Sequence, residues 1–182
     1  MIAPLSSASV PRTIALVRYG QIPEVARSRF PEDLAVRRGQ KVVVQTHRGL
    51  ELATVVDIVR RRAEDGDDAV PMEIVRSVSA EDEAKARAQR NALQGEFAAW
   101  ERRIAEWKVD LQLIDLEVTL DGAKLILYVL NDRGPECTKL ALQAAAAGFG
   151  VIEVQPVSAQ GLVAMPKGGG GGGCGSGGCG CG

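Results

Sequence analysis

The sequence predicts an α+β protein with a small β-barrel-like N-terminal sheet, a ferredoxin-like βαββαβ unit and a disordered Gly/Cys tail. Short alternating segments, broken by glycine and proline turns, fill the first third of the chain. Strand and helix patterns alternate from residue 70 onward. Residues 168–182 hold eleven of the 21 glycines. We therefore divide the chain into residues 13–62, 70–158 and 159–182.

The first segment contains four candidate strands. TIALVRY alternates apolar residues with others and predicts a strand that ends at Gly20. QIPEVARSRF predicts a second strand, in which Pro23 favours an edge or a bulged position. The clearest hairpin consists of KVVVQT and LELATVVDIV on either side of HRG, with Gly49 in the turn. Strands this short, joined by tight turns, are typical of a small open barrel or a curled sheet.

The second segment follows an acidic spacer, AEDGDDAVP, and has the order strand, helix, strand, strand, helix, strand. MEIVRSV is the first strand, and Ser79 is suited to begin a helix of about 28 residues. One apolar stripe on this helix predicts packing onto a sheet rather than a coiled-coil partner. Its members are Ala86, Leu93, Phe97, Trp100, Ile104 and Trp107. LQLIDLEVTL and AKLILYVL form a hairpin, Pro135 opens the second helix, and FGVIEVQPV is the last strand.

Charge is divided unevenly along the chain, although the net charge is only −1. Residues 12–62 carry eleven Lys and Arg against five Asp and Glu, whereas residues 63–130 carry eight against fifteen. A basic module of this kind attracts phosphate or an acidic partner surface. The N-terminal residues lack the apolar run of a signal peptide, and no stretch approaches the length of a membrane span. We therefore expect a cytoplasmic protein that does not bind a membrane.

Residues suited to catalysis are few. His47 is the only histidine and lies in a hairpin turn beside Arg48, with no carboxylate near it in sequence to orient it. The glycine run leads into no helix, so it does not form a phosphate-binding loop. We expect a protein that is not an enzyme, with His47 exposed in its turn.

Three carboxylates on one predicted strand and its turn form the densest acidic group: Asp115, Glu117 and Asp121. A metal site could use them. The alternating positions are apolar, which predicts that they face the core: Ile114, Leu116 and Val118. This alternation favours a solvated outer face for the carboxylates.

Basic residues are concentrated in the predicted barrel, and few aromatic residues accompany them. Such a surface binds nucleic acid through phosphates, but it offers little for base stacking. A solvated or partner-facing surface explains it equally well. If nucleic acid does bind, the candidate residues are Arg18, Arg37, Arg38 and Lys41.

Three of the four cysteines, Cys174, Cys179 and Cys181, lie in the glycine-rich tail. Thiolates are soft ligands for zinc or for iron–sulfur clusters, and glycine lets the backbone fold closely around a metal. Three ligands are fewer than the usual four, so a flexible tail with free thiols remains the alternative. Cys137, at the start of the second helix, is expected to be a buried small hydrophobe.

Several segments together resemble the polymerase suppressor (Psp) C-terminal domain family, which includes YaaT-like bacterial proteins. The resemblance covers roughly residues 14–157, from VRYG through GQKVVVQTHRGLELATVV to LIDLEVTLDGAKLILYV. Cys174, Gly175 and Cys179 match the family's cysteine pattern, whereas Cys181 is displaced by one glycine. The segment after the last strand and the NDRGPECTKL helix start depart from the family.

The resemblance implies a non-catalytic cytosolic adaptor that binds protein partners in a complex tied to RNA processing, with iron–sulfur clusters associated with that complex. Its candidate contact residues are Arg48, Gly49 and Glu51, together with the tail. The alternative function is an RNA- or DNA-binding module that uses the basic N-terminal sheet. A third hypothesis is a metal-carrying tail mounted on a folded domain.

Overall fold

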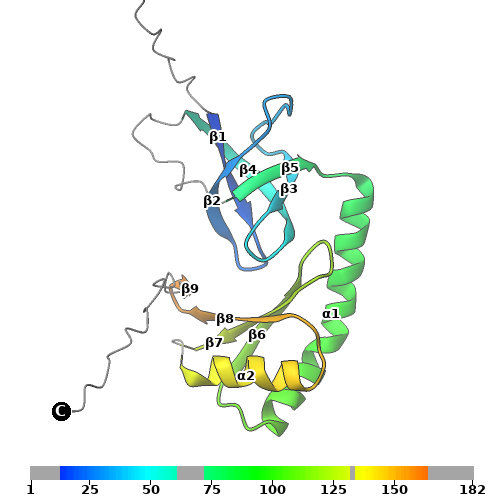
Figure 1. The fold of residues 1–182 in the computed structure, drawn as a ribbon, viewed down its shortest axis with the longest axis vertical. Helices are drawn as coiled ribbons and strands as arrows, with labels where there is room; N and C mark the ends of the chain where they lie inside the picture. The colour runs from blue at the N-terminus through cyan, green and yellow to red at the C-terminus, as the bar shows by residue number, and fades with distance from the viewer. Residues whose placement is uncertain (1–12, 61–71, 132–133, 164–182) are drawn as a thin grey trace, which may run out of the picture.

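A computed structural model of the chain describes residues 13–60, 72–131 and 134–163. Within these residues, five strands close into a barrel and four more form an open sheet that is accompanied by two helices (Figure 1). The predicted α+β class is therefore confirmed. The barrel consists of β1 (Thr13–Tyr19), β2 (Glu24–Arg29), β3 (Lys41–Gln45), β4 (Leu50–Arg60) and β5 (Met72–Ser77), in the order β1-β2-β5-β3-β4.

Alternation along the strands produces the barrel core. Ala15, Val17 and Tyr19 are two residues apart on β1 and lie in one buried cluster with Val42 and Val44 of β3. Successive side chains of a strand point to opposite faces, so this spacing places one apolar row inside the barrel. The hairpin predicted around HRG is formed by β3 and β4, which pair from Lys41 opposite Thr54 to Gln45 opposite Leu50.

The prediction that MEIVRSV begins the ferredoxin-like unit is wrong, because β5 belongs to the barrel. It pairs in parallel with β2 and antiparallel with β3. Met72 and Ile74, which are 6% and 0% exposed, complete the barrel core. Without β5, both β2 and β3 would present an unpaired edge to solvent. The barrel therefore extends beyond the predicted boundary at residue 62.

The long helix α1 (Ala80–Glu106) begins where its sequence predicts. The Ser79 side chain accepts a hydrogen bond from the Asp82 backbone, and the Asp82 carboxylate accepts one from the Ser79 backbone, which is a complete capping box. Trp100 and Ile104 are buried near the other end of the helix, against the second sheet. The apolar stripe thus packs onto a sheet, as predicted.

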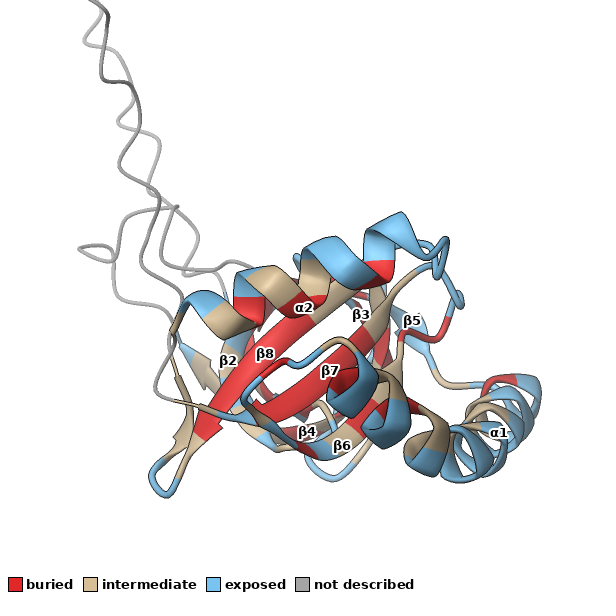
Figure 2. Cartoon of the chain, turned by 90° about the horizontal axis from the view of Figure 1, so that it is seen from below, coloured by how far each residue is buried: buried red, intermediate tan, exposed pale blue. Residues whose placement is uncertain are grey.

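The second sheet contains β6 (Gln112–Val118), β7 (Leu125–Leu130), β8 (Ile152–Ser158) and β9 (Gly161–Leu162), in that order. β6 and β7 form the predicted hairpin, and α2 (Pro135–Ala146) crosses from β7 to the parallel strand β8. α2 lies along the buried residues of β7 and β8 on one face of the sheet (Figure 2), and the opposite face is turned toward the barrel. Neither α1 nor α2, the helices of the described ranges, has the length and apolarity required to cross a membrane.

The second sheet differs from the predicted βαββαβ unit. The elements that follow β5 are α1, β6, β7, α2, β8 and β9, so no strand from before α1 enters this sheet. β9 was not predicted: residues 159–182 were expected to form only a tail, but Gly161 and Leu162 pair with Ser158 and Val157 of β8. The rest of the predicted tail, residues 164–182, lies outside the described residues.

Candidate functional site

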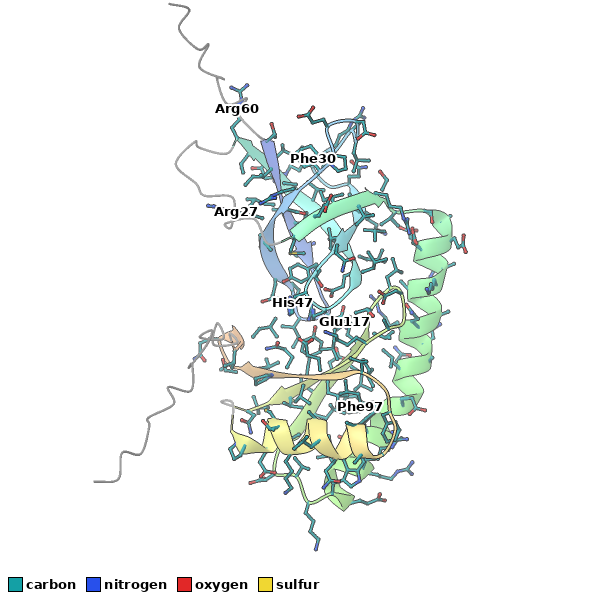
Figure 3. All side chains as sticks on the ribbon, in the orientation of Figure 1. Arg27, Phe30, His47, Arg60, Phe97 and Glu117 are labelled. Carbon is teal, nitrogen blue, oxygen red and sulfur yellow. The ribbon has the colours of Figure 1, made fainter. Side chains whose placement is uncertain are left out.

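The barrel meets the second sheet through turns from both, in a region that we call the junction. It comprises residues 20–21, 46–51 and 117–121, together with Tyr128. The Leu120 backbone N–H donates to the Leu50 carbonyl at 2.7 Å. The Gln21 backbone N–H donates to Glu117 Oε2 at 3.0 Å. These bonds join residues far apart in the sequence, and Figure 3 shows His47 and Glu117 lying between the two parts.

A buried ion pair forms the centre of the junction. Arg48 and Glu51 are 4% and 3% exposed, and the guanidinium donates to both carboxylate oxygens, at 2.8 Å and 3.2 Å. The Thr46 hydroxyl donates to Glu51 Oε2 at 2.6 Å. Burial raises the pKa of Glu51 above its ordinary value, against the lowering by Arg48. Burial is the largest influence and alone would lower the pKa of Arg48, but Glu51, Tyr128 and Glu117 together outweigh it and raise that pKa.

Tyr128 connects this pair to the second sheet. Arg48 Nη1 donates to the Tyr128 hydroxyl oxygen at 3.0 Å, and that hydroxyl donates to Glu117 Oε2. Burial, followed by the Glu117 charge, raises the pKa of the Tyr128 phenol, so it stays a protonated donor. The guanidinium also lies 5.3 Å from the ring centroid of Tyr19. We call Thr46, Arg48, Glu51, Glu117 and Tyr128 the junction network.

A pocket of about 130 Å³ lies beside the junction network. The barrel, the middle of α1 and β6 all contribute walls. Its apolar lining consists of Leu52, Ala86, Leu93, Leu116, Val118 and Leu120, and its polar lining of Gln21, Glu51, Gln89, Arg90 and Glu117, with Gly20 between them. The pocket therefore combines apolar walls with two carboxylates, one of which is bound to Arg48.

The predicted partner-contact residues Arg48, Gly49 and Glu51 lie inside the junction, where the second sheet covers them. The side chains of Arg48 and Glu51 are buried and bind each other, and Arg48 also binds Tyr128, so a partner could contact this pair only through the pocket. Gly49 has φ +142°, and a Cβ there would lie 3.2 Å from Asp121 Oδ2. The reason is tertiary: the end of the β6–β7 hairpin covers the HRG turn. Of the three residues, Glu51 is the one that lines the pocket.

The basic residues predicted for nucleic-acid binding are exposed on the barrel. Arg18 and Lys41 both pair with Thr54 of β4, from opposite sides, so all three point outward in one row. Arg37 and Arg38 precede Lys41 in the turn that leads into β3. The Lys41 ammonium donates to Glu83 of α1 at 2.7 Å, which neutralises one of the four charges.

Of the remaining candidate residues, His47 and Cys137 lie where the sequence predicts, whereas Glu117 does not. His47 is exposed as predicted, with Nε2 3.6 Å from Glu153 Oε1. Cys137 is buried as predicted, at 9% exposure. Glu117 does not lie on a solvated outer face, because it binds Gln21 and Tyr128 within the junction.

Metal binding by the tail stays a prediction, because Cys174, Cys179 and Cys181 lie outside the described residues. In residues 13–60, 72–131 and 134–163, no group of three or more His, Cys, Asp or Glu side chains could hold a metal ion. The hypothesis that Asp115, Glu117 and Asp121 form a metal site therefore has no support in the described part of the chain.

Tyr128 and Gln21 contribute to the junction without having been predicted from the sequence. One signal was present: Tyr128 is the only polar side chain in LILYVL, an otherwise aliphatic strand, and it is fully buried. A buried phenol requires a hydrogen-bond partner, so it indicates a polar contact on that face of the sheet. Nothing local marks Gln21, which uses its backbone.

Comparisons of the chain with known proteins found no matching family model, no matching curated protein and no matching solved structure. The resemblance to the Psp C-terminal domain family therefore stays a prediction from sequence motifs.

Proposed function

We propose that the protein is a non-catalytic adaptor that binds other proteins in RNA processing or in its regulation. The observation that carries the proposal is the pocket beside the junction network. Small-molecule sites typically measure about 300–1,000 Å³, whereas this pocket measures about 130 Å³. A cavity of about 150 Å³ accommodates a molecule the size of benzene. The pocket therefore suits one inserted side chain better than a metabolite.

Protein interfaces commonly obtain most of their binding energy from a few anchor side chains that fill such pockets. The walls here come from three elements, and hydrogen bonds across the junction hold two of them together. A pocket that is formed before binding lowers the ordering cost of association. The resemblance to YaaT-like adaptors, stated from the sequence, supports RNA processing as the setting of this binding.

The proposal can be tested by filling the pocket. Ala86 lines it, whereas Ala88 lies on the exposed side of α1. Ala86→Phe should abolish the capture of proteins that the tagged wild-type chain retains from cell extract, and Ala88→Phe should retain them. The captured set should include proteins that process RNA. Capture that is equal for both variants, or the absence of any captured protein, would contradict the proposal.

A second candidate function, RNA binding, is favoured by one observation. Arg18, Arg37, Arg38 and Lys41 are all exposed on the barrel, and two of them point outward in one row across adjacent strands. Phosphates are bound by arrays of this kind with a strong dependence on salt. The ion pair of Lys41 with Glu83 reduces this surface to three unneutralised charges. We therefore place RNA binding second.

A further inference from the structure

The pocket contains one carboxylate, Glu117, that belongs to no ion pair among the described residues. Arg48 and Glu51 neutralise each other, whereas Glu117 has no cation bound to it in the described ranges. When the exposed Arg90 at the rim is counted, the pocket is neutral, but Arg90 forms no ion pair with Glu117. Both hydrogen bonds to Glu117 end on Oε2, from Gln21 N–H and Tyr128 O–H. No donor among the described residues binds Oε1.

The walls around this carboxylate are suited to a long aliphatic stem. Leu93 and Ala86 contribute from α1, Leu52 from β4, and Leu116 and Val118 from β6. Lysine and arginine side chains bury their methylene groups against apolar surface and place the charged group at a polar end. A carboxylate already oriented by two hydrogen bonds can accept a charge-assisted bond with little further ordering.

We propose that the pocket binds the side chain of an arginine or lysine from a partner polypeptide, with its stem against the leucine walls and its cation on Glu117. This inference rests on the proposed function and names the chemistry of the partner. Arg90 stands at the rim and is exposed. Its charge repels the incoming cation, which favours partners whose flanking residues are acidic.

The test uses the isotope-labelled full chain and a blocked pentapeptide with a central arginine between alanine and glycine residues. The control peptide carries citrulline, which has nearly the same shape but no charge. The arginine peptide should shift the backbone amide signals of Gln21, Leu52 and Val118 in a saturable manner, and the citrulline peptide should not. Glu117→Gln should weaken binding by about tenfold, because a charged hydrogen bond is replaced by a neutral one.

Glu117→Gln retains an acceptor for Tyr128 and Gln21, and urea unfolding should confirm that it folds. Arg90→Gln is exposed and serves as the second variant: it should tighten binding. Glu96→Gln, at an exposed position outside the pocket, is the matched control and should change nothing. Equal shifts with citrulline, shifts only outside the pocket, or weaker binding by Arg90→Gln would each overturn the inference.

The adaptor function and the binding of a basic side chain can be refuted independently of each other. If Ala86→Phe abolishes partner capture but the arginine peptide does not bind, the adaptor function stands, and the proposal that a basic side chain enters the pocket is refuted. If the peptide binds at Glu117 but Ala86→Phe captures the same proteins as wild type, the pocket recognises cations and the adaptor function has lost its support.

Discussion

Removing the guanidinium from the junction should be among the most destabilising single changes in the chain. Arg48→Met keeps an apolar stem of similar length but leaves Glu51 buried, at 3% exposure, without its counter-charge. It also removes the donor to Tyr128. Breaking a buried ion pair by removing one partner typically costs about 3–5 kcal/mol. Since a domain is stable by only about 5–15 kcal/mol, we expect a large fraction of the free energy of unfolding to be lost.

The pH dependence of this loss identifies its cause. Burial raises the pKa of Glu51 even beside Arg48, and removing Arg48 raises it further. Glutamates of the unfolded chain have a pKa of about 4.3. Above that pH the unfolded chain has released this proton, whereas the folded variant still holds it on Glu51. Stability of Arg48→Met therefore falls as pH rises above that value, with a slope of up to about 1.4 kcal/mol per pH unit. In acid, Glu51 is protonated in both states and the difference from wild type is smallest.

Urea unfolding at about pH 5 and about pH 7.5 measures this effect. The decisive comparison is with the double variant Arg48→Met/Glu51→Gln, which has the same missing cation but no buried charge. It should recover part of the stability at the higher pH and lose the slope. If both variants are equally destabilised at both pH values, the cost lies in lost packing and the electrostatic reasoning is refuted.

Three further outcomes are expected. The hydrogen bond from Arg76 is the main cause that holds the pKa of Asp82 well below its usual range. Asp82→Asn should therefore unfold at a lower temperature than wild type at neutral pH. The two unfolding temperatures should converge as pH falls below about 4, because Asp82 of the wild type then becomes protonated. Replacing Arg37 and Arg38 by glutamine should lower the slope of log affinity for single-stranded RNA against log salt by about 1.4 if both contact phosphates, and an unchanged slope would exclude them. The full chain purified without oxygen should carry iron or zinc, and a chain that ends at Lys167 should carry neither by elemental analysis; equal metal in both would exclude the tail cysteines as ligands.

Local signals were sufficient for most of the elements. The Ser79–Asp82 capping box begins α1 where predicted, and both strong hairpins form with glycine in their turns, Gly49 at φ +142° and Gly122 at φ +78°. Each of these signals depends on residues within a few positions of one another. They require no knowledge of what packs against the element.

The partner of a strand is not a local property, and here the prediction was wrong. The apolar alternation of MEIVRSV fits the edge of either sheet, and the acidic spacer before it suggested a boundary. β5 enters the barrel because Met72 and Ile74 complete a core that four strands leave open. A period of two identifies a strand and its buried face, but it does not identify the sheet.

The candidate site shows the same limit. Strict alternation predicted Ile114 in the core, but the pairing of β6 with β7 shifts between Leu113 and Asp115. Leu113 and Leu116, three apart, are therefore buried, and Ile114 is 40% exposed. A β-bulge inserts one residue into the pattern and reverses the faces beyond it. Beyond the shift, Leu116 lies in the core as predicted and Glu117 lies on the opposite face, but the barrel covers that face, so Glu117 meets Gln21 and Tyr128 instead of solvent.

The polar character of the junction explains why a pocket persists there. Among the described residues, a small apolar cluster lies between the barrel and the second sheet: Ile126, Tyr128 and Val157, to which Ile22 and Leu162 are added. Apolar contacts are non-directional, so an interface made only of them would allow the two parts to slide until the gap beside α1 closed. Hydrogen bonds are directional, and such a movement would break those from Arg48 to Tyr128 and from Gln21 to Glu117 and leave buried polar groups unpaired. The junction network therefore sets the angle between the two parts, and the pocket is the space that this fixed angle leaves between the barrel, α1 and β6.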